Sequence, residues 1–223
     1  ADLLTACGLQ KSQDLYAWWF VDADDILTKW EHIAARMARR ESVTIRTIRR
    51  DHFVEDVQAC LQVYNGTQSD SWEFTRLTEA EFDYMVRRLD QIGVSDHAYL
   101  AEVDGRAVGF ALTLPDINEV IQPLNGRLTH FGLPINVARF AYRLRRVKTA
   151  RMMVLCLLEG YRRRGIGELL VLHTLRKGKQ KYGFQQAELG WTVDGNDAID
   201  RFLERVGAER YKTYRVFEKS LVG

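Results

Sequence analysis

The residues best suited to chemistry lie between Leu155 and Gly167, in the run LCLLEGYRRRGIG. An apolar strand pattern there leads into a loop that holds Gly165 and Gly167, and a helical pattern follows. Such a loop points several backbone N–H groups at one spot, at the positive end of the helix dipole. Glycine lets the backbone approach a ligand closely, and Arg162 to Arg164 bring positive charge suited to phosphate. The run therefore predicts a pyrophosphate-binding loop.

Two common phosphate-binding loops do not fit this run. Gly160 and Gly165 have the spacing of a P-loop, but Ile166-Gly167 follow where Lys and Ser or Thr are required. Gly165 and Gly167 begin a dinucleotide fingerprint, but Leu170 stands where its third glycine belongs. The simplest alternative is a solvated basic turn that enters a helix and binds nothing.

Around this loop the sequence predicts an α+β domain over about residues 42–223. Alternating β-branched residues indicate strands, apolar residues three or four apart indicate helices, and Asp104-Gly105 indicates a hairpin turn. Thr78 and Glu81 form a capping box that starts a helix. Residues 115–148 form an irregular excursion with a helix of its own. The expected strands are 43–50, 98–103, 107–114, 152–158, 187–193 and 210–221, and the expected helices are 24–40, 53–64, 78–93, one ending at Tyr182, and 196–206.

Residues 1–20 repeat the pattern of residues 200–219 without a gap. Both stretches contain a helix end, a glycine, a basic residue and an aromatic-rich strand. We therefore expect residues 1–41 to be the tail of a truncated upstream module of the same fold plus a linking helix, with the complete domain at 42–223; chance recurrence is the alternative. The best-matched pairs are Leu4 with Leu203, Gly8 with Gly207, and Lys11 with Arg210.

Composition narrows the class of protein. The 223 residues are 46% hydrophobic and 28% charged, as expected of a folded globular chain. The 32 basic residues against 30 acidic ones leave a net charge of +2, too small for a general nucleic-acid binder. No metal site is expected, because the five histidines lack metal-ligand spacing.

The cellular setting is inferred from cysteine usage and from apolar runs. The three cysteines are widely separated, which favours a reducing compartment, and Cys156 lies in an apolar strand that suits a core residue better than a nucleophile. No signal peptide or membrane-spanning run is evident. We expect a cytoplasmic protein, with a possible peripheral position at the inner face of the membrane.

The segment Arg162-x-x-Gly165-x-Gly167 resembles the signature of the GNAT superfamily of acyl-CoA-dependent N-acyltransferases. That signature, Arg/Gln-x-x-Gly-x-Gly/Ala, follows the family's fourth strand. Asn196 and Gly207 resemble the asparagine and glycine that flank a late helix of the family. The DLYAW, PLNGRL and RYKTYRVFEKSL segments are similar to a subgroup of long bacterial GNAT-like proteins, some of which are ceramide synthases.

The resemblance implies a twisted mixed sheet, flanked by helices and splayed between its fourth and fifth strands to admit a thioester. The donor would be acetyl-CoA or a longer acyl-CoA, without a metal. The backbone of Leu155, Leu157 and Leu158 would pair with the pantetheine arm, an N–H near Leu157 would stabilise the oxyanion, and Asn196 would bind the arm or cap its helix. The pyrophosphate would be held by the loop residues Arg162, Arg163, Arg164, Gly165, Ile166, Gly167 and Glu168.

Two catalytic groups are expected beside the thioester. Strand alternation puts Glu188 opposite the apolar side chains of the fifth strand, where a partly desolvated carboxylate can act as a base. The family's usual acid, a tyrosine, is replaced here by Leu203. Tyr214 is our candidate acid and Tyr211 is its alternative. The rival bases are Glu159, which stands where the family often has proline, Glu119 and His130.

The excursion suggests the acceptor. In residues 134–148 a helical wheel puts Arg139, Arg143 and Arg146 on the side opposite an apolar stripe, which consists of Val137, Phe140, Ala141, Leu144 and Val147. A basic amphipathic helix of this kind suits an anionic membrane surface and a lipidic, sphingoid-like amine; alternatively, the stripe packs on the sheet. The sequence thus predicts an N-acyltransferase in which a primary amine attacks the thioester directly. The rival is a catalytically degenerate GNAT-fold module that binds CoA or a partner.

Overall fold

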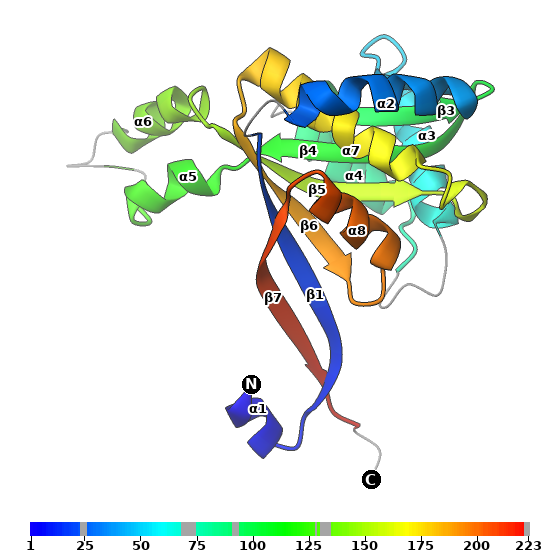
Figure 1. Cartoon of the computed structure of the whole chain (residues 1–223). Coiled ribbons are helices and arrows are strands. Elements are labelled where there is room, and N and C mark those ends of the chain that lie inside the picture. Colours follow the sequence, from blue (N-terminus) through cyan, green and yellow to red (C-terminus); the bar gives the residue numbers. More distant parts are fainter. Residues whose placement is uncertain (23–25, 68–74, 91–93, 128, 130–134, 221–223) are drawn as a thin grey trace.

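The computed structural model describes residues 1–22, 26–67, 75–90, 94–127, 129 and 135–220. Seven strands form one sheet in the order β2-β3-β4-β5-β6-β1-β7 (Figure 1). Only β5 and β6 are parallel; the other neighbouring strands are antiparallel. The strands are β1 Gln10–Val21, β2 Val43–Thr47, β3 Ala98–Val103, β4 Arg106–Pro115, β5 Thr149–Leu157, β6 Gln186–Val193 and β7 Glu209–Glu218.

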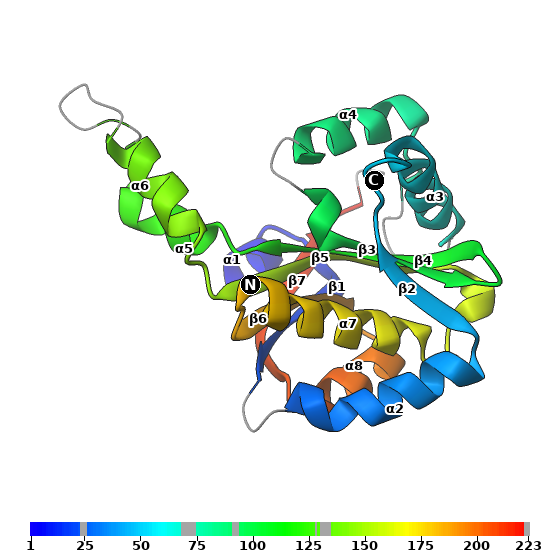
Figure 2. The ribbon, with the colours of Figure 1, turned by 90° about the horizontal axis from the view of Figure 1, so that it is seen from above.

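Helices cover both faces of the sheet (Figure 2). α2, α7 and α8 lie on one face, and α3 and α4 lie on the other, so the predicted α+β class is confirmed. Short 3-10 turns precede β3 and follow β5, and α7 continues into a single π-helical turn, Gly178–Tyr182. The helices are α1 Asp2–Ala6, α2 Ile26–Arg40, α3 Phe53–Gly66, α4 Glu79–Asp90, α5 Asn118–Ile121, α6 Ile135–Leu144, α7 Ile166–Lys177 and α8 Asp197–Arg205.

The order of elements after residue 42 is the one that the sequence predicts. The capping box forms as expected, since the Thr78 amide donates to Glu81 and the Glu81 amide donates to the Thr78 hydroxyl. Asp104 and Gly105 make the turn between β3 and β4. The last predicted extended segment is β7, at the edge of the sheet.

β5 and β6 pair for only four residues and then separate. Their register runs from Thr149 opposite Gln186 to Met152 opposite Leu189, although both strands continue beyond that point. A register shift accompanies the bend of each strand. For β5, the shift lies at Met153, in its pairing with β4. For β6, the shift lies opposite Ala17, in its pairing with β1. The open region, here called the wedge, is the predicted splay between the fourth and fifth strands of the domain.

β1 lies between β6 and β7, so residues 42–223 do not complete the sheet by themselves. Trp18 and Phe20 of β1 and Leu27 of α2 belong to the core under α7 and α8. The segment before residue 42 is therefore part of the same folded body, whatever its origin. β1 and β7 extend together beyond the other strands as a two-stranded ribbon with α1 near its end (Figure 1).

The two halves of the sequence repeat have the same local structure. α1 and α8 end at equivalent residues, and both are followed by a glycine of positive φ, 78° at Gly8 and 83° at Gly207. The Leu9 amide donates to the Leu4 carbonyl as the Ala208 amide donates to the Leu203 carbonyl. These hydrogen bonds form the same helix C-cap in both places.

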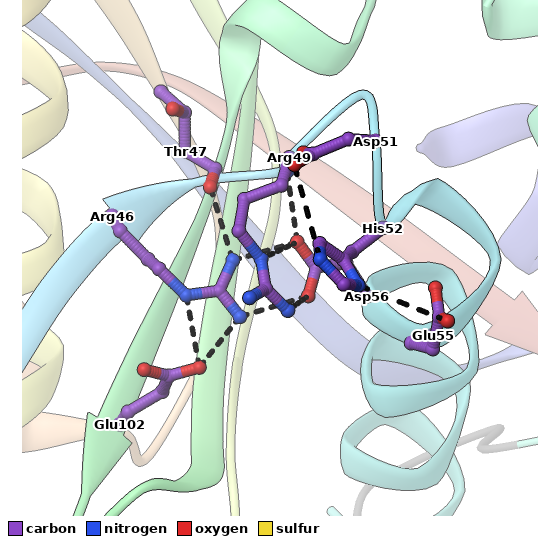
Figure 3. Close-up of polar contacts among 8 residues, drawn as sticks. All are labelled: Arg46, Thr47, Arg49, Asp51, His52, Glu55, Asp56 and Glu102. Atoms are coloured by element: carbon purple, nitrogen blue, oxygen red, sulfur yellow. Dashed lines mark hydrogen bonds and ion pairs between the residues drawn. The ribbon is translucent and has the colours of Figure 1, made fainter.

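An ion-pair network around the buried Asp56 fastens α3 to the edge of the sheet (Figure 3). Both oxygens of Asp56 accept hydrogen bonds from Arg46 of β2, at 2.6 and 2.8 Å, and Arg49 adds further bonds. Arg46 also reaches Glu102 of β3. Burial alone raises the pKa of Asp56, but the hydrogen bonds from both arginines outweigh it and hold the pKa well below its usual value. The stabilisation is present above that usual value and is lost as the pH falls toward the lowered pKa.

α5 and α6 form a lobe that projects from the end of the sheet where β4 ends and β5 begins (Figures 1 and 2). Its predicted apolar stripe is divided between two environments. Phe140 and Leu144 pack against the core and Val147 is buried, but Val137 and Ala141 are exposed. The inward side of α6 also carries the buried polar residue Asn136, whose side-chain amide donates to the Arg127 carbonyl. One part of the stripe therefore packs inward, and the other part stays on the surface.

Candidate active site

The predicted phosphate loop connects β5 to α7 through the 3-10 turn Glu159–Tyr161. Gly165 precedes α7 with a φ of 81°, a conformation that glycine adopts at little cost. Among the described residues, no group accepts a hydrogen bond from any backbone N–H of residues 163–168. These amides lie at the positive end of a twelve-residue helix and are available to an anion.

The three arginines of the loop differ in their freedom. Arg162 donates to the carbonyl of Thr67 at the end of α3. The Arg164 Nε lies 2.7 Å from Glu41, and its guanidinium lies over the Tyr161 ring. Arg163 is exposed and has no ion-pair partner within the described ranges. Arg163 thus leaves its guanidinium exposed to solvent, while Arg164 helps to hold the loop against the end of α2.

The β5 edge facing the wedge is formed by alternate residues. The Leu158 amide donates to the Val108 carbonyl, and its own carbonyl accepts from Tyr161. Because hydrogen-bonding direction alternates along a strand, Cys156 also turns toward β4, whereas Leu155 and Leu157 turn toward the wedge. The backbone of Leu158 is occupied by the protein, so the expectation that it pairs with pantetheine is corrected. Leu155 and Leu157 keep the orientation that this pairing requires.

Glu188 lies on the last paired stretch of β6, at the closed end of the wedge. It is only 7% exposed, and its two oxygens have different partners. Arg151 of β5 is 2.9 Å from Oε1, and the Tyr211 hydroxyl donates to Oε2. Lys212 in turn donates to the Tyr211 hydroxyl over 2.9 Å. Burial, followed by the bond to Glu188, raises the pKa of Tyr211, so its hydroxyl stays protonated at neutral pH.

The other candidate residues lie apart from this cluster. Tyr214 contacts the Trp191 ring, with centroids 5.8 Å apart. Glu119 binds the Thr149 hydroxyl and the Lys148 amide at the base of the lobe, and Glu159 is exposed in the loop. Asn196 is the exposed N-cap of α8, but its side chain makes no capping hydrogen bond. His130 lies outside the described residues.

Cysteine chemistry has little support at this site. Burial raises the pKa of the Cys156 thiol to about 11 and that of the Cys60 thiol to about 12. Both thiols stay protonated near neutral pH, and a protonated thiol is a poor nucleophile. Over the described part of the chain, no group of three or more His, Cys, Asp or Glu side chains could hold a metal ion, and no helix has the length and apolarity to span a membrane.

Sequence reasoning missed the partners of the site. Arg151 lay just outside the predicted strand 152–158, whereas β5 begins at Thr149 and includes it. A charged residue directly before an apolar run was the available signal that a buried carboxylate lies opposite. Tyr211 was considered only as an alternative to Tyr214. A register shift opposite Ala17 and Trp18 displaces Tyr211 from regular alternation, and nothing in the sequence marks this shift.

Residues 57–208 match the acetyltransferase (GNAT) family, and the chain belongs to that family. It is 35% identical over 220 residues to Protein YghO of Escherichia coli, and 31% identical over 222 residues to the bacterial ceramide synthase of Caulobacter vibrioides. Each match covers 96% of this chain, but only 55% and 56% of those proteins. The chain therefore spans just over half the length of these relatives.

Solved structures show the same fold. A GCN5-related N-acetyltransferase from Sphaerobacter thermophilus aligns with 97% of this chain and 54% of its own, at 14% identity and a TM-score of 0.60. A tandem GNAT protein from the clavulanic acid biosynthesis pathway aligns with 97% and 57%, at 12% identity and a TM-score of 0.53. At these identities the likeness concerns the fold alone, and it confirms the predicted GNAT architecture.

Proposed function

We propose that the chain transfers an acyl group from acyl-CoA to the nitrogen of a primary amine. The observation that carries the proposal is the set of unpartnered amides at residues 163–168, next to the β5 edge that opens into the wedge. A pyrophosphate on those amides leaves the pantetheine arm free to run along Leu155 and Leu157. The thioester then reaches the closed end of the wedge, where Glu188 lies.

The chemistry follows from this arrangement. The amine nitrogen bonds to the thioester carbon, the carbon–sulfur bond breaks, and the proton from the amine passes to Glu188. Both Glu188 oxygens are engaged, so the carboxylate accepts a proton only as its contact with Arg151 or Tyr211 loosens. Tyr211, rather than Tyr214, is the hydroxyl in contact with the base and the proposed proton donor to the CoA thiolate.

The acceptor class is inferred from a relative and from the surface. The relative from Caulobacter vibrioides bears the name of a ceramide synthase, which supports a long-chain amine as acceptor. A degenerate CoA-binding module is the second candidate. It is favoured by Leu203, which is buried at the position where the family often has a tyrosine, and by the fully bonded Glu188. Release of free CoA on adding an amine separates the two functions.

Three glycine variants test the phosphate loop. Gly167→Ala has open space around the added Cβ, which projects toward the N-terminus of α7, where the pyrophosphate would bind. We expect it to weaken CoA binding about tenfold, or ~1.4 kcal/mol, with unchanged stability. Gly160→Ala, also unobstructed, is the matched control and should bind CoA normally.

Gly165→Ala places alanine at a positive φ and brings its Cβ into a clash with Met37, so it should lower the free energy of unfolding by about 1 kcal/mol. Calorimetric titration and urea unfolding measure these effects; equal CoA binding by all three contradicts the proposed loop.

Two tyrosine variants test the catalytic assignment. Tyr211→Phe removes the hydroxyl bonded to Glu188, and we expect acyl transfer to slow roughly a hundredfold while CoA affinity stays constant. Tyr214→Phe is the control, with a change of less than about threefold expected. Free thiol released from an acyl-CoA by an amine is the measured quantity. A larger loss in Tyr214→Phe than in Tyr211→Phe would return the role to Tyr214.

We also propose that the lobe contacts an anionic membrane. Ile117, Ile121 and Tyr142 are exposed there, and residues 135–148 contain five basic side chains and no acidic one. Replacing Arg139 and Arg143 together by Gln should weaken binding about thirtyfold to vesicles with one third phosphatidylglycerol, at roughly 1 kcal/mol per arginine. The double replacement of Arg201 and Arg205 on α8 is the control. If the unchanged protein does not float with these vesicles, the membrane proposal is wrong.

We further infer that α1 and β1 are the end of a preceding GNAT-like module whose own β6-like strand pairs with the free edge of β7. The pairing of β1 with β7 is symmetric with respect to the repeat. Gln10 pairs with Glu218, and their repeat equivalents, Glu209 and Trp19, pair with each other in the same way. Leu3 and Leu4 are 84% and 42% exposed, whereas their equivalents Phe202 and Leu203 are 1% and 2% exposed in the core. The greater length of the relatives supports this inference.

A leucine truncation tests the missing module. In the 223-residue chain Leu4→Ala should change stability by less than about 0.5 kcal/mol, since Leu4 contacts no core. In a protein that includes the inferred preceding module, Leu4→Ala should cost roughly 3 kcal/mol. Leu203→Ala should cost about the same with or without that module. Urea unfolding gives these values. No added cost of Leu4→Ala in the longer protein would remove the inferred module.

A further inference from the structure

A cavity of about 100 Å³ lies between the sheet and the helices α3 and α4. Its lining side chains are apolar except for the thiol of Cys60 and the phenol of Tyr64. They include Val57 of α3, Val86 of α4, Ala98 of β3 and Val154 of β5. Cavities with such linings stay dry when empty and take up apolar ligands.

The floor of this α3–α4 cavity runs across three neighbouring strands toward the wedge. Ala98 pairs with Leu112, and Leu112 pairs with Val154, and all three line the cavity. Val154 is two residues beyond Met152, the last β5 residue paired with β6, and that is roughly 7 Å along a strand. The cavity therefore ends beside the closed end of the wedge.

The α3–α4 cavity and Glu188 lie on the same face of the sheet. Met152 and Leu189 point into the core under α7 and α8, so Arg151 and Glu188 point to the opposite face. Val154 and Cys156 pack with Val57 and Phe82 on that opposite face. A chain attached to a carbon that reacts near Glu188 can thus extend beneath α3 and α4 without crossing the sheet.

We propose that the α3–α4 cavity binds the first part of an alkyl chain carried by one of the two substrates. The inference rests on the proposed function, because it needs the thioester at the closed end of the wedge. A comparison of the affinities for octanoyl-CoA and acetyl-CoA tests whether the cavity binds an alkyl chain carried by the donor. Octylamine compared with ethylamine, in protein saturated with CoA, tests a chain on the acceptor.

Two variants fill the α3–α4 cavity. Ala98→Leu adds three carbons at its floor, and Val86→Phe enlarges a partly exposed side chain on α4, which keeps the test usable if the first variant unfolds. Ala38→Leu, in a separate groove between α2 and α7, is the matched control. Circular dichroism confirms that each variant is folded.

Affinities from calorimetric titration decide the outcome. The unchanged protein should bind octanoyl-CoA at least tenfold more tightly than acetyl-CoA, because each buried methylene adds several-fold in affinity. In both filling variants this affinity ratio should fall to near one while the affinity for acetyl-CoA stays constant, and the control should keep the ratio.

If filling the cavity lowers only the ratio of octylamine affinity to ethylamine affinity, the alkyl chain belongs to the acceptor. If neither ratio exceeds one, or if filling leaves it unchanged, the cavity is a packing void only and the proposal is overturned. Failure of every CoA thioester to bind would instead overturn the proposed function, and octylamine and ethylamine titrated without CoA would still test the cavity.

Discussion

The separation of β5 from β6 is the constraint on which the site depends. Four residue pairs hold the strands together, and two register shifts then direct β5 toward β4 and β6 toward β1. Gly190 permits the second bend, because a side chain there would crowd the backbone of Tyr16 and Ala17. Where the strands part, two backbone edges lose their natural partner. Peptide groups along the wedge are thereby left without a strand partner, which is the feature on which the proposed pairing with an extended ligand rests.

The charges near the closed end of the wedge follow from the same geometry. A carboxylate as buried as Glu188 needs compensation, and it receives one cation from β5 and one hydroxyl from β7. These two strands lie on opposite sides of β6 in the sheet order. The contacts of Glu188 therefore connect three segments that are far apart in the sequence. Any group that displaces Arg151 or Tyr211 changes the electrostatics of Glu188 directly.

The sequence predicted the order of elements and the glycine turn before α7 because these depend on local patterns. Alternation, a capping box and the Gly165-Ile166-Gly167 turn act within a few residues and need no tertiary information. The partners of Glu188 could not be derived in the same way. The register shift beside Tyr211 depends on how β1 and β7 twist together, and the ion pair with Arg151 depends on which strands are parallel. Which part of α6 packs inward also depends on tertiary contacts, since Asn136 is buried and Val137 is exposed.

The position of β1 also affects how the molecule is made. β1 is synthesised before every other strand of this sheet, yet both of its neighbours, β6 and β7, are the last two strands of the sheet to be made. Until they are synthesised, Trp18 and Phe20 have no sheet in which to be buried, and an apolar strand with two open edges is prone to pair wrongly. Closing the sheet brings together residues as far apart in the sequence as Gln10 and Glu218, and contacts of such long sequence separation slow folding. The β1–β7 ribbon therefore makes completion of this sheet a late event, because both edges of β1 stay open until β6 and β7 have been synthesised.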